Sequence, residues 1–177
     1  MFINQKITKF LFFLFCFSIF SSISQTNEDV PLNNIAINEI PKPISTIIFE
    51  DSSGNEINLN NYHGKLVIIN FWATWCAPCK KEMPSLDVLQ SNNENIKVFP
   101  INLEKPNQKK TRKFFEDLNI KSLEIYFDPE FELSKKFKLK GVPTTIILDK
   151  SGKEFARIIG EVDFNNKKFL TWLKKIN

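Results

Sequence analysis

The chain has 177 residues, with 24 lysines and arginines against 20 acidic residues, three cysteines and a single histidine. This length suits one domain of ordinary size. Three cysteines are too few for a fold that depends on a disulfide framework, and one histidine excludes a metal enzyme that needs several histidine ligands. The positive charge is weaker than that of a typical nucleic-acid-binding domain, so we expect no nucleic acid partner.

The first 24 residues have the order of a secretory signal. Residues 1–9 carry two lysines and no acid, and residues 10–20 are mostly Phe, Leu and Ile. Small serines follow at positions 22 and 24, where a signal peptidase cleaves. The apolar run is shorter than the roughly 20 residues of a spanning helix, although an uncleaved anchor stays open. We therefore expect a periplasmic protein, secreted across or anchored to the inner membrane, where thiols tend to be oxidised.

The rest of the chain alternates between strand and helix patterns. Residues 25–43 are polar and hold three prolines, which is typical of a tether, so we place the folded domain at 44–177. The expected elements are a hairpin at 45–59, strands at 66–72, 96–102, 124–127, 144–149 and 154–159, helices at 77–90, 107–119 and 129–137, and a last helix capped by Asp163. This order predicts an α/β domain in which helices cover both faces of a mixed sheet.

A pair of cysteines, Cys76 and Cys79, follows the most apolar of these strands. The strand ends at about Trp72 and a helix begins near Cys76, whose thiol pKa should fall below its usual value of about 8.5 at the positive end of the helix dipole. Cys79 lies in the first turn and can close a small disulfide ring, and Pro78 costs that turn nothing. We expect an exposed Cys76 to attack a partner disulfide and Cys79 to resolve the product.

Two other interpretations of the pair are weaker. A structural staple would constrain little chain, because the ring is small, and a zinc site would need a second cysteine pair that the sequence lacks. His63 precedes the strand at 66–72, whereas Cys76 follows it. Because a strand rises about 3.3 Å per residue, we expect His63 to be a turn residue at the far end of the strand, and we expect no metal site.

The segment FWATWCAPCKKEMPSL, residues 71–86, resembles the active-site segment of thioredoxin-fold proteins of the TlpA/ResA-like branch, which are thiol-disulfide oxidoreductases. Gly141-Val142-Pro143-Thr144 is similar to the cis-proline loop of that family. The resemblance implies a thioredoxin fold with an N-terminal β-hairpin and an extra strand-helix insertion at 124–137. It also implies that Val142–Pro143 is cis and lies against the cysteine pair. The further site residues implied for shaping the active site and binding substrate are Trp75, Ala77, Pro78, Val142 and Pro143.

Three positions bear on proton transfer. Asn70 stands where thioredoxin has a buried acid, and an amide cannot titrate. Ala77 stands where ResA-like proteins carry an acid between the cysteines. Glu82 is the nearest remaining carboxylate, and some relatives keep an acid there. Glu82 is therefore either a proton shuttle for Cys79 or a solvated helix position, and the sequence leaves both open.

The resemblance implies a reductant that acts outside the cytoplasm. Its clients would be proteins with cysteine pairs, either apocytochrome c or copper-site proteins of cytochrome oxidase assembly. A membrane electron donor would recharge it, it would be a monomer, and it would need no cofactor beyond the Cys76–Cys79 disulfide. Two alternatives remain: a Cu(I)-binding chaperone that uses both thiols as soft ligands, and a thiol peroxidase.

Overall fold

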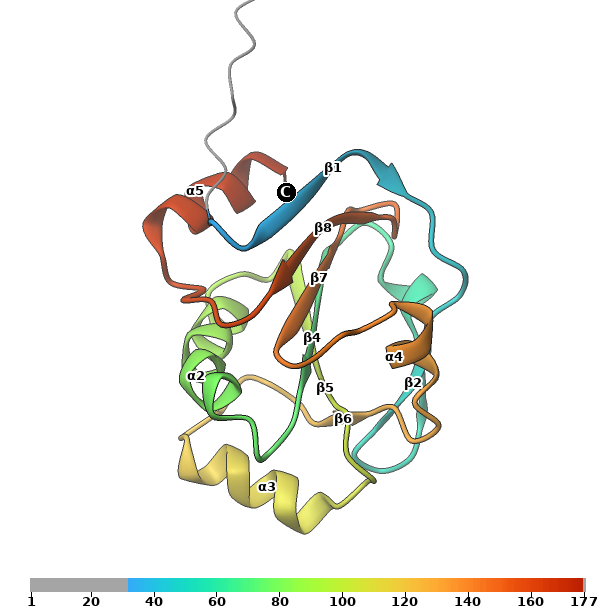
Figure 1. Cartoon of the computed structure of the whole chain (residues 1–177), viewed down its shortest axis with the longest axis vertical. Helices are drawn as coiled ribbons and strands as arrows, with labels where there is room; N and C mark the ends of the chain where they lie inside the picture. The colour runs from blue at the N-terminus through green and yellow to red at the C-terminus, as the bar shows by residue number, and fades with distance from the viewer. Residues whose placement is uncertain (1–31, 177) are drawn as a thin grey trace, which may run out of the picture. The chain divides into compact units, whose positions relative to one another are not determined.

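The computed structural model describes residues 32–176. Eight strands form one mixed sheet in the order β1-β8-β7-β4-β5-β6-β2-β3 (Figure 1). The strands are β1 (Ile35–Lys42), β2 (Ile48–Asp51), β3 (Glu56–Asn58), β4 (Leu66–Trp72), β5 (Ile96–Asn102), β6 (Tyr126–Phe127), β7 (Thr144–Leu148) and β8 (Glu154–Ile159). The helices are the 3-10 turn η1 (Leu59–Tyr62), α2 (Ala77–Ser91), α3 (Gln108–Asp117), α4 (Glu132–Lys136) and α5 (Lys167–Ile176).

The central strand, β4, organises the domain. It runs parallel to β5 and antiparallel to β7, and all of its residues are buried. Successive side chains of a strand point to opposite faces, so Ile68 and Trp72 join one hydrophobic cluster while Ile69 and Phe71 join the other. A strand that is covered on both faces reads as a continuous apolar run, which is why the pattern at 66–72 is unbroken.

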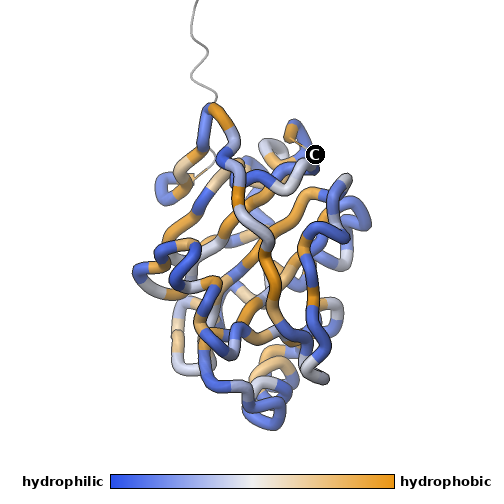
Figure 2. Tube along the Cα trace, turned by 90° about the vertical axis from the view of Figure 1, so that its right-hand side faces the viewer, coloured by the Kyte–Doolittle hydropathy of each residue, from blue (hydrophilic) through white to orange (hydrophobic). Residues whose placement is uncertain are grey.

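Helices cover both faces of the sheet. Leu86 of α2, Phe114 of α3 and Phe169 of α5 pack in the cluster on one face, and Leu133 of α4 packs in the cluster on the other. Figure 1 shows α2 and α4 on opposite sides of the central strands, and Figure 2 shows hydrophobic segments through the middle of the domain. The predicted α/β class with a mixed, doubly covered sheet is confirmed. Among residues 32–176, no helix is both long enough and apolar enough to cross a bilayer.

The expected domain boundary at residue 44 is wrong, because Ile35–Lys42 forms the edge strand β1 and pairs antiparallel with β8. Ile35 and Ile37 pack against the core. Prolines suggested a tether here, but an edge strand tolerates them because only one of its sides joins the ladder. Pro41 lies where the β1–β8 register shifts. The expected signal at 1–24 and the start of the expected tether lie outside the described residues.

The remaining elements follow the predicted order with small differences. The hairpin of β2 and β3 is confirmed, whereas β6 and α4 are shorter than expected. The last helix is capped by Asn166 and not by Asp163: the Asn166 side chain accepts the backbone N–H groups of Lys168 and Phe169. The Asp163 carboxylate instead accepts the N–H of Asn165 in the preceding turn.

The turn between β7 and β8 requires a glycine at position 152. Gly152 has φ +78°, and a Cβ there would lie 2.7 Å from Nε2 of His63. Gly54, in the turn between β2 and β3, has a similar φ of +82° but no atom within 4 Å of such a Cβ. The two glycines therefore share the backbone constraint and differ only in the steric one.

Replacing each glycine by alanine should separate these two costs. Gly54→Ala should lower the free energy of unfolding by about 1–2 kcal/mol, the cost of a left-handed backbone for a residue with a Cβ. Gly152→Ala should lower it by a similar amount, because the atom that the methyl group would meet is the tip of the exposed His63 side chain, which can turn aside. Urea unfolding of both variants measures the difference. A clearly larger loss for Gly152→Ala would mean that the imidazole is held in place.

Candidate active site

The two cysteines of the predicted pair are joined in a disulfide at the start of α2, with Cα atoms 5.3 Å apart. Cys76 is the N-cap residue of the helix, and its sulfur accepts the backbone N–H of Cys79 at 3.2 Å. Pro78 lies in the first turn, where no intrahelical hydrogen bond is lost. Free N–H groups and the helix dipole both favour a thiolate at this position after reduction. The predicted placement of the pair is confirmed.

The sulfurs are less accessible than expected. Cys76 is 3% exposed and Cys79 is 0% exposed, so the expectation of an exposed Cys76 is wrong for the disulfide form. The residues on either side of Cys76 in the sequence are exposed: Trp75 is 71% exposed, and Ala77 and Pro78 are also exposed. We call these three residues the rim.

The loop before β7 lies at the same end of the sheet. The Val142–Pro143 bond is cis, as the resemblance implied. Thr144 pairs with Phe71, so Pro143 lies beside the end of β4 from which the cysteine loop leaves. The Pro143 carbonyl accepts the N–H of Gly160 at 2.9 Å, which ties the loop to the end of β8. Val142 is half-buried and packs against both hydrophobic clusters.

Glu82 is buried on α2, one turn after Cys79, and is only 1% exposed. Its carboxylate accepts the side-chain amide of Asn70 at 2.8 Å and the backbone N–H of Val162 at 3.0 Å. Burial raises the pKa of Glu82 to about 7, although these two hydrogen bonds oppose the rise. The alternative of a solvated helix position is therefore wrong.

Asn70 connects this carboxylate to the sheet. The residue is 0% exposed, and the same amide nitrogen also donates to Oγ1 of Thr145 on β7 at 3.0 Å. The side-chain amide of asparagine has two donor hydrogens, so both are used. The Asn70 carbonyl oxygen has no protein partner among the described residues.

Sequence reasoning missed a second acid at this end of the sheet, Glu104, which follows β5. Its carboxylate accepts the backbone N–H of Thr74 at 2.6 Å and the Thr74 hydroxyl at 3.1 Å. Lys110 on α3 donates to it at 2.6 Å and Asn102 at 3.4 Å. Burial raises the pKa of Glu104, but the hydrogen bonds from Lys110, Thr74 and Asn102 outweigh burial and lower it to about 2. The predicted topology could have revealed Glu104, because the carboxyl ends of parallel strands meet at one edge of a sheet, and Glu104 follows such an end.

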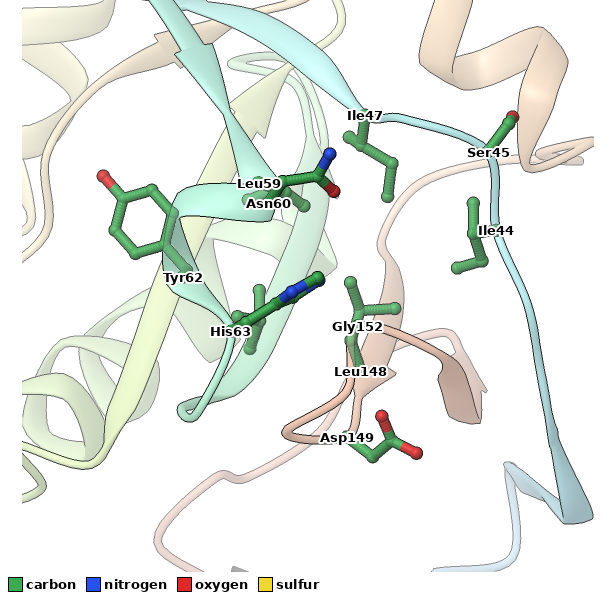
Figure 3. A pocket seen from close by; sticks show the side chains of 11 residues that line it. Ile44, Ser45, Ile47, Leu59, Asn60, Tyr62, His63, Leu148, Asp149 and Gly152 are labelled. Atoms are coloured by element: carbon green, nitrogen blue, oxygen red, sulfur yellow. The ribbon is translucent and has the colours of Figure 1, made fainter.

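His63 lies at the opposite end of β4, as predicted. Figure 3 shows His63 with Leu148 and Gly152 around a small cavity, whose lining also includes Val67 near the start of β4. The cavity has a volume of about 20 Å³, which is room for about one water molecule. His63 is therefore separated from the cysteine pair by the length of the strand.

Comparisons with known proteins agree with this geometry. The profile of the AhpC/TSA family matches residues 40–153. The thiol-disulfide oxidoreductase ResA of Bacillus anthracis is 30% identical over 138 residues, which cover 78% of this chain and 79% of that protein. The crystal structure of a DsbF homologue from Corynebacterium diphtheriae has a TM-score of 0.66 at 27% identity, covering 81% of this chain and 90% of that one. StoA from Bacillus subtilis has a TM-score of 0.61 at 26% identity, covering 74% and 99%. The chain belongs to the AhpC/TSA family and is a thiol-disulfide oxidoreductase of the TlpA/ResA-like branch.

Proposed function

We propose that this oxidoreductase acts outside the cytoplasm as a reductant of client cysteine pairs, in cytochrome c maturation or in copper-site assembly of cytochrome oxidase. The observation that carries the proposal is the disulfide at the start of α2, which has exposed apolar neighbours in the sequence and lies at the same end of the sheet as a cis-proline loop. The location rests on the signal pattern of residues 1–24. A structural neighbour from Corynebacterium glutamicum is named a secreted thiol-disulfide isomerase, which agrees with it.

The reaction moves two electrons and needs only the cysteine pair. In the reduced protein, the Cys76 thiolate attacks one sulfur of a client disulfide and displaces the other as a thiolate, which takes up a proton. The Cys79 thiolate then attacks the Cys76 sulfur, the mixed disulfide breaks, and the client leaves with both cysteines reduced. The protein is left with the Cys76–Cys79 disulfide, and a membrane electron donor returns the two electrons.

Client binding uses the rim and the loop. An exposed indole has a large apolar surface, and Trp75 with Ala77 and Pro78 gives such a surface on both sides of Cys76 in the sequence. Pro143 and Val142 flank the end of β4 from the other side. We propose that the Val142 backbone pairs with an extended client segment, which would bring the client disulfide to Cys76.

Glu82 supplies the proton transfer that this sequence of steps needs. Cys79 must lose a proton before it can attack, and its side chain is fully buried. Glu82 lies one turn further along α2, on the buried side of the helix that it shares with Cys79. A carboxyl group with a pKa of about 7 exchanges protons readily near neutral pH. We propose that it takes the Cys79 proton, either directly or through one water molecule.

Trapping tests the proposed exchange. In a Cys79→Ser variant of the full chain, the mixed disulfide through Cys76 cannot be resolved, so client adducts should accumulate in the cell envelope. Alkylation of free thiols, non-reducing electrophoresis and mass spectrometry would identify the clients. A Cys76→Ser variant is the matched control and should trap none. The absence of adducts, where an established exchange enzyme traps its own clients, would contradict the mechanism. Stoichiometric Cu(I) binding without disulfide reduction would favour the chaperone instead.

The Glu82 carboxyl makes stability and rate depend on pH. Its pKa is about 7 in the folded protein and near 4.5 in the unfolded chain. The folded state therefore binds more protons between these values, and stability should fall as the pH rises from about 5 to 7, by about 3 kcal/mol at most. Glu82→Gln should remove this slope, together with the inflection near pH 7 in the rate of disulfide exchange.

Urea unfolding of the oxidised protein at several pH values measures that slope. Glu161→Gln is the control, because Glu161 is a more exposed neighbour whose charge raises the pKa of Glu82 only slightly. This variant should keep most of the slope. If the free energies of unfolding of the wild type and Glu82→Gln change with pH by the same amount, Glu82 does not titrate in this range.

A further inference from the structure

The loop that leads from β4 to Cys76 is held by a carboxylate from another strand. Only three residues, Ala73, Thr74 and Trp75, separate the end of β4 from the helix cap. Inside this loop, the Cys76 N–H donates to the Ala73 carbonyl at 3.1 Å. The remaining contact comes from outside, because both donors of Thr74 point to Glu104. We infer that Glu104 is a positioning residue that fixes this loop for the docking of protein clients.

Glu104 is itself held from several directions. Its own N–H donates to the Asn102 side chain at 2.9 Å, and the Leu103 N–H donates to the Trp72 carbonyl at 2.9 Å. Lys110 completes the arrangement from α3 with an ion pair of 2.6 Å. The carboxylate therefore joins the ends of two adjacent parallel strands and the first turn of α3. Hydrogen bonds to an ionised acceptor are about twice as strong as neutral ones, so the Glu104 carboxylate holds Thr74 strongly. We call this carboxylate the anchor of the loop.

The anchor and its cation differ in exposure. The Glu104 side chain is 19% exposed, whereas the Lys110 side chain is 53% exposed. The Glu104 side chain is thus mostly buried, whereas about half of the Lys110 side chain is in contact with solvent. A surface ion pair contributes little by itself, so the loop depends on the contact between Glu104 and Thr74. Lys110 is accordingly the matched control, because it touches the same carboxylate from the solvent side.

The fixed backbone of Thr74 affects Trp75, which directly follows it and is 71% exposed. A large side chain on a short loop must lose motion when a partner docks on it, and this loss weakens binding. Fixing the Thr74 backbone reduces that loss before the partner arrives. A small disulfide has too little surface to cover the rim, so its reduction should not depend on the contact between Glu104 and Thr74. This inference rests on the proposed docking of client proteins at the rim.

Steady-state reduction of insulin, as a protein disulfide, and of 5,5′-dithiobis(2-nitrobenzoate), as a small one, tests this role. Glu104→Ala should raise KM for insulin about tenfold, as expected for the loss of a charge-assisted hydrogen bond, with kcat and the small-disulfide rate within about twofold. Glu104→Gln should recover only part of the loss, because its single amide oxygen can still accept the Thr74 N–H but the charge and the second acceptor oxygen are gone. Thr74→Val should show part of the effect, and Lys110→Gln should show almost none.

Amide hydrogen exchange at Thr74 measures how firmly Glu104 holds this N–H group, with no client present. Exchange should be faster in Glu104→Ala than in the wild type and in Lys110→Gln. An unchanged KM for insulin, equal losses on both substrates, or unchanged exchange at Thr74 would each overturn the inference. Failure of the wild-type protein to reduce insulin would count against the proposed function. The positioning role would then be decided by hydrogen exchange, in Glu104→Gln as well if Glu104→Ala does not fold.

Discussion

The pairing of β4 with its two neighbours brings the active site together at one edge of the sheet. In the parallel ladder Trp72 lies opposite Asn102, and in the antiparallel ladder Phe71 lies opposite Thr144. The cysteine loop, the segment that holds Glu104 and the cis-proline loop therefore emerge side by side, although they are far apart in the sequence. Each ladder also depends on apolar residues on both faces of β4, so the packing that stabilises the core also positions the site.

Eight of the described residues are polar or charged and buried, and one of them lies within the apolar run of β4, next to the active site. Asn70 is the polar residue within the apolar run of β4, and it contacts Glu82 on α2 and Thr145 on β7. Buried polar groups destabilise a fold unless they are hydrogen-bonded, and here both donors of the Asn70 amide are satisfied, while its oxygen has no protein partner within residues 32–176. The contact of Glu82 with the Val162 N–H extends the network to the loop after β8. Helix, sheet and loop thus meet at a single titratable carboxyl group.

The parts of the fold that could be predicted are those that depend on neighbours in sequence. The run at 66–72 and the Cys76–Cys79 spacing are local signals, and both led to the observed structure. The strand β1 was missed because the prolines around it carry the same signal in a tether and in an edge strand. Glu82 was left undecided because the sequence does not show which side of α2 packs on the sheet. The contact between Glu104 and Thr74 joins residues 30 positions apart, which no local pattern reveals.

The two acids of the site have opposite environments, and this difference separates their roles. Glu82 is buried among neutral donors, so its pKa rises to about 7, whereas Glu104 is held by the cation of Lys110 and by Thr74, so its pKa falls to about 2. A group of the first kind can take and return a proton during exchange, and one of the second kind keeps a constant charge and geometry. In the proposed mechanism, proton movement is thus confined to the buried side of α2. The loop that carries Trp75 is held by a carboxylate whose charge does not change with pH in the neutral range, so the proposed docking surface would stay fixed while Glu82 titrates.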